Sequence, residues 1–347
     1  MLVFVVLLIL LSVNQANVLS IPPYPNALAA CDALSSNTSA LITFMHGFGW
    51  TNPDGIKGYS RNSGCGGVCG NEFFRWDNGP QGFGDHSGPG NSTQFPSSLN
   101  LGATFDPSLA LTFGQALGQE FWDKGTNIYE GPGVNIARNE LNGRTFEYLS
   151  GEDPVLGARL AVPLVQGVQE YVMAIGKHYI ANNQETDRSG ENNVIDERTM
   201  MELYSPAFAA MAPYVAGYMC AYNRINGDYA CENNHTLNIM LKGYFNFSGF
   251  VVSDWGATHS TAHAINNGLD IDMPDDRYFS EVLIKQAVEN GNVTVARLKD
   301  SCVRILSQWY NLPQDKRSIH IAFCSVLSLS IFVKLILVKI LPSIFSQ

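Results

Sequence analysis

The stretch GFVVSDWG, residues 249–256, decides the fold that we expect for this chain. Phe250 to Ser253 are apolar or small, and two of the four are β-branched valines, which is typical of a short buried strand. The strand ends in Asp254, followed by Trp255 and a glycine. At the carboxyl end of a barrel strand such an aspartate is a candidate nucleophile, and Trp255 offers an apolar face for a ring. The alternative interpretation is that Asp254 only caps a helix over residues 257–267.

Predicted strands and helices alternate on both sides of this stretch, which favours a parallel sheet with crossover helices. Charged residues recur directly after strands, at Arg138, Lys177, Asp254 and Asp272. We therefore predict an α/β fold of the (β/α)8 TIM-barrel type, with an irregular course allowed, and expect these four side chains at one end of it. No G-x-G-x-x-G turn follows a strand, which disfavours a nucleotide-binding doubly wound sheet. The predicted strands cover residues 127–136, 172–179, 218–222, 250–253 and 268–274. The predicted helices cover residues 107–124, 156–171, 197–211, 237–244, 257–267 and 295–309.

Composition limits the kinds of partner. The chain has 347 residues and a formal net charge of −10. It contains no basic run with interleaved aromatic residues, so we expect no nucleic-acid partner. Residues 17–74 are rich in Gly, Asn, Ser and Pro and poor in periodic pattern, so we predict a loop-rich region there, ahead of a barrel over residues 75–312. The motifs indicate no cofactor and no metal site.

The first residues predict export. Residues 1–16, MLVFVVLLILLSVNQA, have an apolar core of signal-peptide length and a small residue near a plausible cleavage point. A signal anchor is the alternative, although about ten apolar residues are too few to span a bilayer. We expect a secreted or extracellular glycoprotein. Asn-x-Ser/Thr acceptor sites for N-glycosylation occur at Asn37, Asn91, Asn234, Asn246 and Asn292.

The seven cysteines fit an oxidising compartment. Cys65 and Cys69 lie close together in a glycine-rich string, but the second Cys or His pair that a zinc site needs does not follow at regular spacing. We therefore favour a local disulfide there. Cys220 and Cys231 flank a turn that contains Asn226-Gly227-Asp228, and we predict a disulfide between them.

The tail over residues 313–347 differs abruptly in composition from the rest of the chain. Residues 319–341 are strongly apolar, with Lys334 and Lys339 as the charged residues, and are long enough for a membrane helix. One interpretation is a membrane anchor, which would replace secretion by a membrane-bound location. The other is that the coding sequence has been read into noncoding sequence, so that the apolar tail is not a genuine segment.

Several short strings together resemble glycoside hydrolase family 3, in its two-domain β-glucosidase branch. Each string is weak alone, but their order and spacing fit the barrel of that family over about residues 75–310. The strings are GPQG (79–82), TFD (104–106), GPGVNI (131–136) with Arg138, GR (143–144), Glu147, GEDP (151–154), KH (177–178) with NQE (183–185), Arg188, Met219 with YN (222–223), and SDW (253–255).

The resemblance implies an exo-acting retaining β-glucosidase. Such an enzyme releases terminal nonreducing β-D-glucose from a β-glucoside or oligosaccharide, here through a glycosyl-enzyme intermediate on Asp254. A sugar is a ring of hydroxyls, so charged donors can fix it while aromatic faces cover its C–H side. The substrate-binding residues implied by position are Asp77, Arg144, Lys177, His178, Arg188, Met219, Tyr222 and Trp255.

Two departures from the family pattern leave alternatives open. The family usually has Asp directly before the early Gly-Pro, whereas this chain has Asn78 there and Asp77 one residue earlier, so either Asp77 binds the sugar or this contact is weakened. The family's two-domain branch takes its acid/base Glu from a domain after the barrel, and this sequence ends about 35 residues past residue 312. The alternative function is therefore a sugar-binding barrel with little or no turnover, unless a partner chain supplies the acid/base or Glu147, Glu152 or Glu185 serves.

Overall fold

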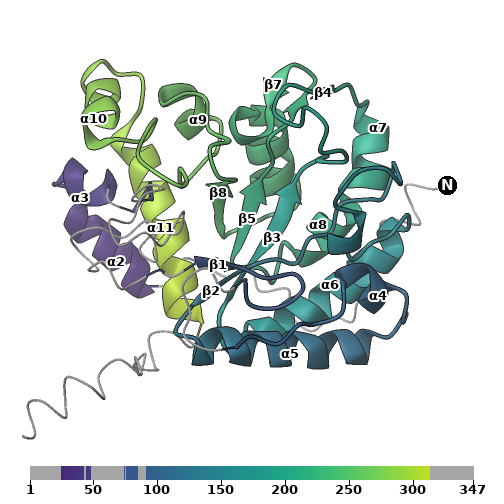
Figure 1. Ribbon diagram of the computed structural model, residues 1–347. Helices are drawn as coiled ribbons and strands as arrows, with labels where there is room; N and C mark the ends of the chain where they lie inside the picture. Colours follow the sequence, from purple (N-terminus) through teal and green to yellow (C-terminus); the bar gives the residue numbers. More distant parts are fainter. Residues whose placement is uncertain (1–24, 43, 48–73, 75, 85–90, 313–347) are drawn as a thin grey trace, which may run out of the picture.

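The computed structural model describes residues 25–42, 44–47, 74, 76–84 and 91–312 (Figure 1). The predictions for the signal peptide, for a Cys65–Cys69 disulfide and for the tail over residues 313–347 lie outside these ranges. Within them, every helix is too short or too polar to cross a membrane.

Five parallel strands form the central sheet, in the order β1-β2-β3-β5-β8. Their neighbours are in register, with Asn78 of β1 opposite Glu130 of β2 and Cys220 of β5 opposite Ser253 of β8. Single parallel bridges extend the sheet from Val252 to Ile271 and from Asp272 to His46. The predicted parallel α/β class is confirmed, and its course is irregular because the strands of the described residues do not close a ring of eight. The strands are β1 (Trp76–Asn78), β2 (Ile128–Glu130), β3 (Met173–Tyr179), β5 (Gly217–Cys220) and β8 (Phe250–Ser253).

Helices surround this sheet (Figure 1). The first residues of two of them are set by aspartate side chains that cap the helix. Asp106 accepts hydrogen bonds from the backbone of residues 108 and 109 ahead of α5 (Pro107–Asp123), and Asp153 caps α6 (Pro154–Val168) in the same way. The two helices cross closely, since a Cβ at Gly114 would lie 2.3 Å from the Leu164 carbonyl oxygen. The other helices along the barrel are α8 (Pro206–Met211), η4 (His235–Tyr244), α9 (Ala262–Asn266), α10 (Glu281–Glu289) and α11 (Val295–Asn311).

Two predicted helices are wrong in detail. The helix expected over residues 197–211 is split into α7 (Glu197–Thr199), the π-helical η2 (Met200–Tyr204) and α8, because Pro206 has no N–H to continue the ladder. The helix expected from residue 257 begins only at Ala262. Asp254 lies eight residues before that start and therefore does not cap it, so the capping interpretation of Asp254 is wrong.

The predicted loop-rich region contains helices that the sequence pattern did not reveal. α2 (Pro25–Leu34) and α3 (Thr38–Ile42) precede the sheet, and a disulfide joins Cys31 of α2 to Cys302 of α11. α2 buries Ala27 and Cys31, which is too narrow an apolar stripe to stand out by periodicity. The remaining short elements are α4 (Ser98–Gly102), η1 (Thr145–Glu147), η3 (Ala230–Glu232) and a second sheet of β4 (Asn192–Asn193), β6 (Arg224–Ile225) and β7 (Asp228–Tyr229).

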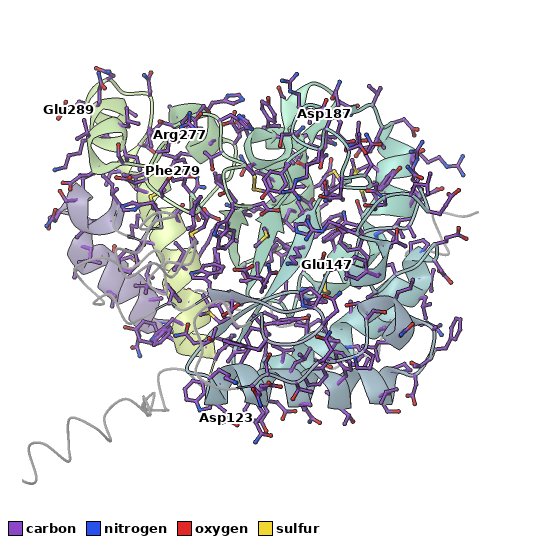
Figure 2. The ribbon with its side chains drawn as sticks, in the orientation of Figure 1. Asp123, Glu147, Asp187, Arg277, Phe279 and Glu289 are labelled. Atoms are coloured by element: carbon purple, nitrogen blue, oxygen red, sulfur yellow. A yellow bond between two sulfur atoms is a disulfide. The ribbon has the colours of Figure 1, made fainter. Side chains whose placement is uncertain are left out.

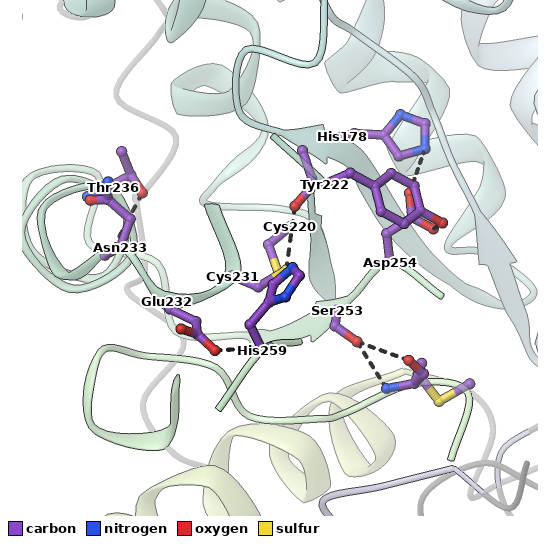
Figure 3. The surroundings of a disulfide bond; sticks show 12 residues. His178, Cys220, Tyr222, Cys231, Glu232, Asn233, Thr236, Ser253, Asp254 and His259 are labelled. Carbon is purple, nitrogen blue, oxygen red and sulfur yellow. Dashed lines mark hydrogen bonds and ion pairs between the residues drawn. A yellow bond between two sulfur atoms is a disulfide. The ribbon is translucent and has the colours of Figure 1, made fainter. Parts of the chain in front are cut away.

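The predicted disulfide between Cys220 and Cys231 is confirmed (Figure 3). It closes a loop that contains the hairpin of β6 and β7, which turns through Asn226 and Gly227 at φ of 52° and 107°. Both central residues have the left-handed conformation that an Asn-Gly hairpin turn favours. The disulfide ties this hairpin to the carboxyl end of β5.

Candidate active site

The structure brings together most of the residues predicted to form the site. Lys177 and His178 lie in β3, Tyr222 follows β5 and Asp254 follows β8 directly, while Arg144 comes from the segment after β2. These strands are parallel neighbours, so their carboxyl ends lie along one edge of the sheet.

Asp254 has one oxygen held and the other open. Its Oδ1 accepts hydrogen bonds from the Trp255 backbone N–H at 2.7 Å and from the Tyr222 hydroxyl at 2.8 Å. Its Oδ2 is buried and has no hydrogen-bond partner, and it lies 3.4 Å from His178 Nε2 (Figure 3). Burial raises the pKa of Asp254, while the charge of Arg144 and the Tyr222 hydrogen bond oppose the rise. The carboxylate is oriented by fixed donors and keeps a free oxygen.

His178 is positioned by the residues around it. Its backbone N–H donates to Asn135 Oδ1 at 2.7 Å, and Asn135 Nδ2 donates to the His178 carbonyl at 2.9 Å. Its Nδ1 lies 3.0 Å from the Tyr148 hydroxyl, which also accepts from Asn182 Nδ2 at 3.1 Å. A hydroxyl that accepts the amide hydrogen still has its own hydrogen to donate, and donation of that hydrogen to Nδ1 would leave the imidazole hydrogen on Nε2, facing Asp254. Burial lowers the pKa of His178 well below its ordinary value, so the ring is neutral.

Glu147, labelled in Figure 2, pairs with the two cations Arg144 and Lys177. Arg144 binds both of its oxygens, at 2.8 and 2.9 Å, and Lys177 Nζ lies 3.3 Å away. Lys177 Nζ also donates to Asn78 Oδ1 at 2.7 Å. Burial alone would raise the pKa of Glu147, but the charges of Lys177 and Arg144 bring it down to about 2. Glu147 therefore fixes two cations and holds no proton to give.

Arg188 closes one side of the site. Its guanidinium stacks over the Tyr222 ring, 4.0 Å from the centroid, and donates to Glu185 Oε2 at 2.6 Å. Glu185 also accepts from Asn182 Nδ2 at 3.0 Å and lies 3.7 Å from Arg144. The loop after β3 is thus tied to both Arg144 and Tyr222.

The other predicted residues have different positions. Asp77 is buried, and its Oδ1 accepts from the Asn78 backbone N–H at 2.8 Å, whereas the side chain that reaches Lys177 is that of Asn78. Met219 is buried in β5 opposite Val252. The Trp255 ring meets the Trp76 ring edge-on at 6.3 Å. Sugar contacts from all the predicted substrate-binding residues, these three included, remain predictions.

Two of the predicted strand-end charges lie outside the buried group. Arg138 is exposed and hydrogen-bonds Tyr204, and its place at the same end of the sheet as Lys177 and Asp254 stays a prediction. The chain leaves β2 after Glu130 and turns at the following Gly-Pro, so Arg138 does not end a strand. Asp272 is buried on the segment that bridges to His46, next to β8.

Sequence reasoning missed three residues that build the site: Glu130, Tyr148 and Asn182. Tyr148 and Asn182 had no signal, because each acts through a contact about 30 residues away in the chain. Glu130 could have been noticed in the sequence, since it is a carboxylate at the end of an otherwise apolar strand, directly before Gly-Pro.

A cavity of about 310 Å³ lies apart from this group. Polar and apolar residues of α7, η2, the second sheet and η4 line it. Among them are Asn226 and an ion pair in which His235 Nε2 lies 2.7 Å from Glu197 Oε2. None of the residues around Asp254 lines it. The buried charges and the open carboxylate oxygen lie around Asp254 instead.

Comparison with known proteins identifies relatives of this chain. The chain is 39% identical over 231 residues to thermostable beta-glucosidase B of Acetivibrio thermocellus, covering 65% of this chain and 30% of that protein. It is 42% identical over 233 residues to a beta-glucosidase of Rhizobium radiobacter, covering 66% of this chain and 28% of that protein. The chain thus spans less than a third of the length of these curated relatives.

Solved structures show the same fold. DesR, a beta-glucosidase from Streptomyces venezuelae in complex with D-glucose, superposes with a TM-score of 0.73 and 32% identity over 83% of this chain and 38% of that chain. Beta-D-glucoside glucohydrolase from Trichoderma reesei superposes with a TM-score of 0.74 and 30% identity, over 86% and 42% respectively. Residues 81–308 match the model of the glycosyl hydrolase family 3 N terminal domain, which is more than half of the chain. The protein therefore belongs to glycosyl hydrolase family 3.

Proposed function

We propose that the site around Asp254 hydrolyses the terminal nonreducing β-D-glucosyl bond of a β-glucoside or oligosaccharide, with retention of configuration. The observation that carries this proposal is the asymmetry of Asp254: two donors hold Oδ1, while the buried Oδ2 has no hydrogen-bond partner. Resemblance to beta-glucosidases, one of them crystallised with D-glucose, supports the choice of sugar.

In the proposed first step, Asp254 Oδ2 attacks the anomeric carbon and the bond to the departing oxygen breaks. The Tyr222 hydroxyl and the Trp255 N–H keep the carboxylate in one orientation, so little reorganisation is needed. Lys177, Arg144 and the neutral His178 supply donors for the sugar hydroxyls. Water then attacks the glycosyl-Asp254 ester and releases glucose.

The glutamates considered from the sequence do not supply the proton that the departing oxygen needs. This result favours a second candidate function. Glu147 is held ionised by Arg144 and Lys177, Glu185 is paired with Arg188, and Glu152 is exposed. Of the three glutamates considered from the sequence, none is a suitable acid. The second candidate is therefore a sugar-binding barrel with little turnover, or one whose acid/base comes from a partner chain or a further domain.

The deciding experiment compares two substrates on the purified chain. An activated aryl β-glucoside scarcely needs a proton on its leaving group, whereas cellobiose does, and general acid help contributes roughly 10²–10⁴-fold. We expect weak release of the phenol, a slow second step and almost no cleavage of cellobiose. Robust cellobiose cleavage would show that the chain supplies its own acid. Glucose binding without any turnover would support the sugar-binding candidate.

We also propose that the protein is exported, as a secreted protein or through a membrane anchor over residues 319–341. The disulfides Cys31–Cys302 and Cys220–Cys231 support an oxidising compartment. All five glycosylation acceptor asparagines are exposed. Detection of the protein in culture medium, with a mass that falls after enzymatic removal of N-glycans, would support export. A protein found only in the cytosol, unglycosylated and with reduced cysteines, would contradict it.

A further inference from the structure

Glu130 is a buried carboxyl group that the proposed reaction does not use. It is the last residue of β2 and lies opposite Asn78 of β1 in the sheet register. Its side chain is 3% exposed, and its Oε1 is buried without a hydrogen-bond partner. Residues directly opposite one another on neighbouring strands point to the same face. Glu130 and Asn78 therefore lie on the same face of the sheet.

Lys177 reaches across this position. It belongs to β3, yet its Nζ donates to Asn78 Oδ1 on β1, at 2.7 Å. Because β2 lies between β1 and β3, that side chain passes over β2 at the level of Glu130. The ammonium nevertheless contacts Asn78 and Glu147, and among the described residues Glu130 forms no ion pair with it.

The charges around Glu130 explain why it forms no pair. The groups that act on it are Asp77 from β1, Lys177 from β3, Glu147 from η1 and Asp254 after β8. The two cations of the group, Lys177 and Arg144, both pair with Glu147, and Asp77 and Asp254 are further carboxylates of the same group. A further buried anion would have no cation of its own. Burial raises the pKa of Glu130 to about 8, with Lys177 opposing the rise and the three carboxylates adding to it.

We propose that Glu130 is a positioning residue, held as a neutral carboxylic acid beneath Lys177, and that its neutrality leaves the lysine ammonium free to bind a sugar hydroxyl. This role rests on the proposed sugar-binding function. If Glu130 ionised, its carboxylate would attract the Lys177 ammonium away from Asn78 and from the sugar. Glu130 is not proposed as the missing acid, because it is enclosed by β1, Lys177 and Glu147.

The first test measures the affinity for D-glucose, which does not titrate in this range, as a function of pH. Glu130→Gln keeps the shape and fixes the neutral state, and exposed Glu152→Gln serves as the matched control. The wild type and the control should bind about tenfold more weakly one unit above the Glu130 pKa, because about a tenth of the molecules then keep the proton. Glu130→Gln should match the wild type at neutral pH and show no such loss. An equal alkaline loss in Glu130→Gln, or a folded Glu130→Gln protein with weak binding at neutral pH, would overturn the proposal.

The second test reads the proton directly and needs no sugar. Infrared difference spectra of wild type against Glu130→Gln should contain the carbonyl band of a protonated carboxylic acid at neutral pH. Titration of ¹³C-labelled glutamates by NMR in the wild type gives the same information if the variant fails to fold. Glucose binding without a protonated Glu130 would refute this proposal alone. A protonated Glu130 without glucose binding at any pH would refute the proposed function, and the positioning role with it.

Discussion

Two buried aspartates near the two ends of β8 differ in how completely they are paired. Asp270 contacts the strand near its amino end, where the Val251 N–H donates to its Oδ2 at 2.9 Å, while Asp254 directly follows the carboxyl end. Asp270 is fully buried, and its oxygens accept from Lys242 at 2.9 Å, Arg297 at 2.8 Å and Ser301 at 2.7 Å. Asp254 is almost as buried but leaves Oδ2 without a hydrogen-bond partner.

The difference in pairing distinguishes Asp270, a charge that stabilises the fold, from Asp254, a charge available for reaction. Although burial alone would raise it, the charges of Lys242 and Arg297 hold the pKa of Asp270 well below its ordinary value. At Asp254 burial prevails, and the pKa is raised. A saturated carboxylate stabilises the fold, whereas an unsatisfied one costs free energy and persists where function requires it. The same substitution at both positions should therefore have opposite consequences.

Asp254→Asn should have the largest effect, on activity. Removal of the proposed nucleophile should lower turnover of an activated aryl β-glucoside on the order of 10⁴-fold, to background. The unfolding free energy should change little, because no cation depends on Asp254 alone, and glucose affinity should persist because the hydroxyl donors are other residues. Steady-state kinetics together with calorimetric glucose binding check this. Retained turnover would show that Asp254 is not the nucleophile.

Asp270→Asn should leave chemistry intact and weaken the fold. The variant leaves Lys242 and Arg297 buried with one negative charge fewer, a defect that typically costs about 3–5 kcal/mol. Denaturant unfolding followed by tryptophan fluorescence measures the loss, and activity per folded molecule should match that of the wild type. An unfolding free energy within about 1 kcal/mol of the wild-type value would mean that water enters this charge cluster.

The two disulfides repeat the comparison on a smaller scale. Cys220→Ser should cost about 2–4 kcal/mol and also lower activity, because the Cys220 carbonyl accepts the Asp254 backbone N–H at 3.1 Å. Cys302→Ser removes the α2–α11 disulfide and should affect stability alone. Thermal unfolding and aryl glucoside kinetics on both variants separate the effects. Alkylation of Cys220 and Cys231 in unreduced secreted protein would contradict their pairing.

Elements that depend on residues close together in the sequence could be predicted, whereas an element held by a residue far away in the sequence could not. β8 was predicted with its observed bounds, because Phe250 to Ser253 are all apolar or small, and the start of α5 follows from a local Asp-Pro cap. The same kind of cap begins α6 at Pro154, two residues before its predicted start. α2 was missed because a disulfide to α11, 271 residues away in sequence, holds it rather than an apolar stripe of its own.

The candidate site shows the same limit. Lys177, His178 and Asp254 could be named from strand ends and a family resemblance. Their contacts could not, because the Tyr148–His178 and Lys177–Asn78 hydrogen bonds form only when neighbouring strands are placed side by side. The sequence pattern indicates which side chains end the strands. The packing of the strands decides which of these side chains keep a polar atom without a hydrogen-bond partner.

Tyr222→Phe should have the smallest effect and tests how Asp254 is kept ionised. The variant removes the hydroxyl that donates to Asp254 Oδ1 at 2.8 Å and keeps the ring beneath Arg188. A hydrogen bond to a charged group typically contributes about 1.5–3 kcal/mol, so turnover should fall roughly 10- to 100-fold.

The Tyr222 hydroxyl favours the ionised carboxylate, so its loss should raise the pKa of Asp254 further. Since the proposed attack needs the ionised form, activity is lost as the pH falls through this pKa, and the acidic limb of the profile should move to higher pH in the variant. Turnover of an aryl β-glucoside across the acid range, measured beside a Tyr244→Phe control at an exposed position, gives the shift. An unmoved acidic limb with reduced turnover would mean that Tyr222 positions the sugar rather than the carboxylate.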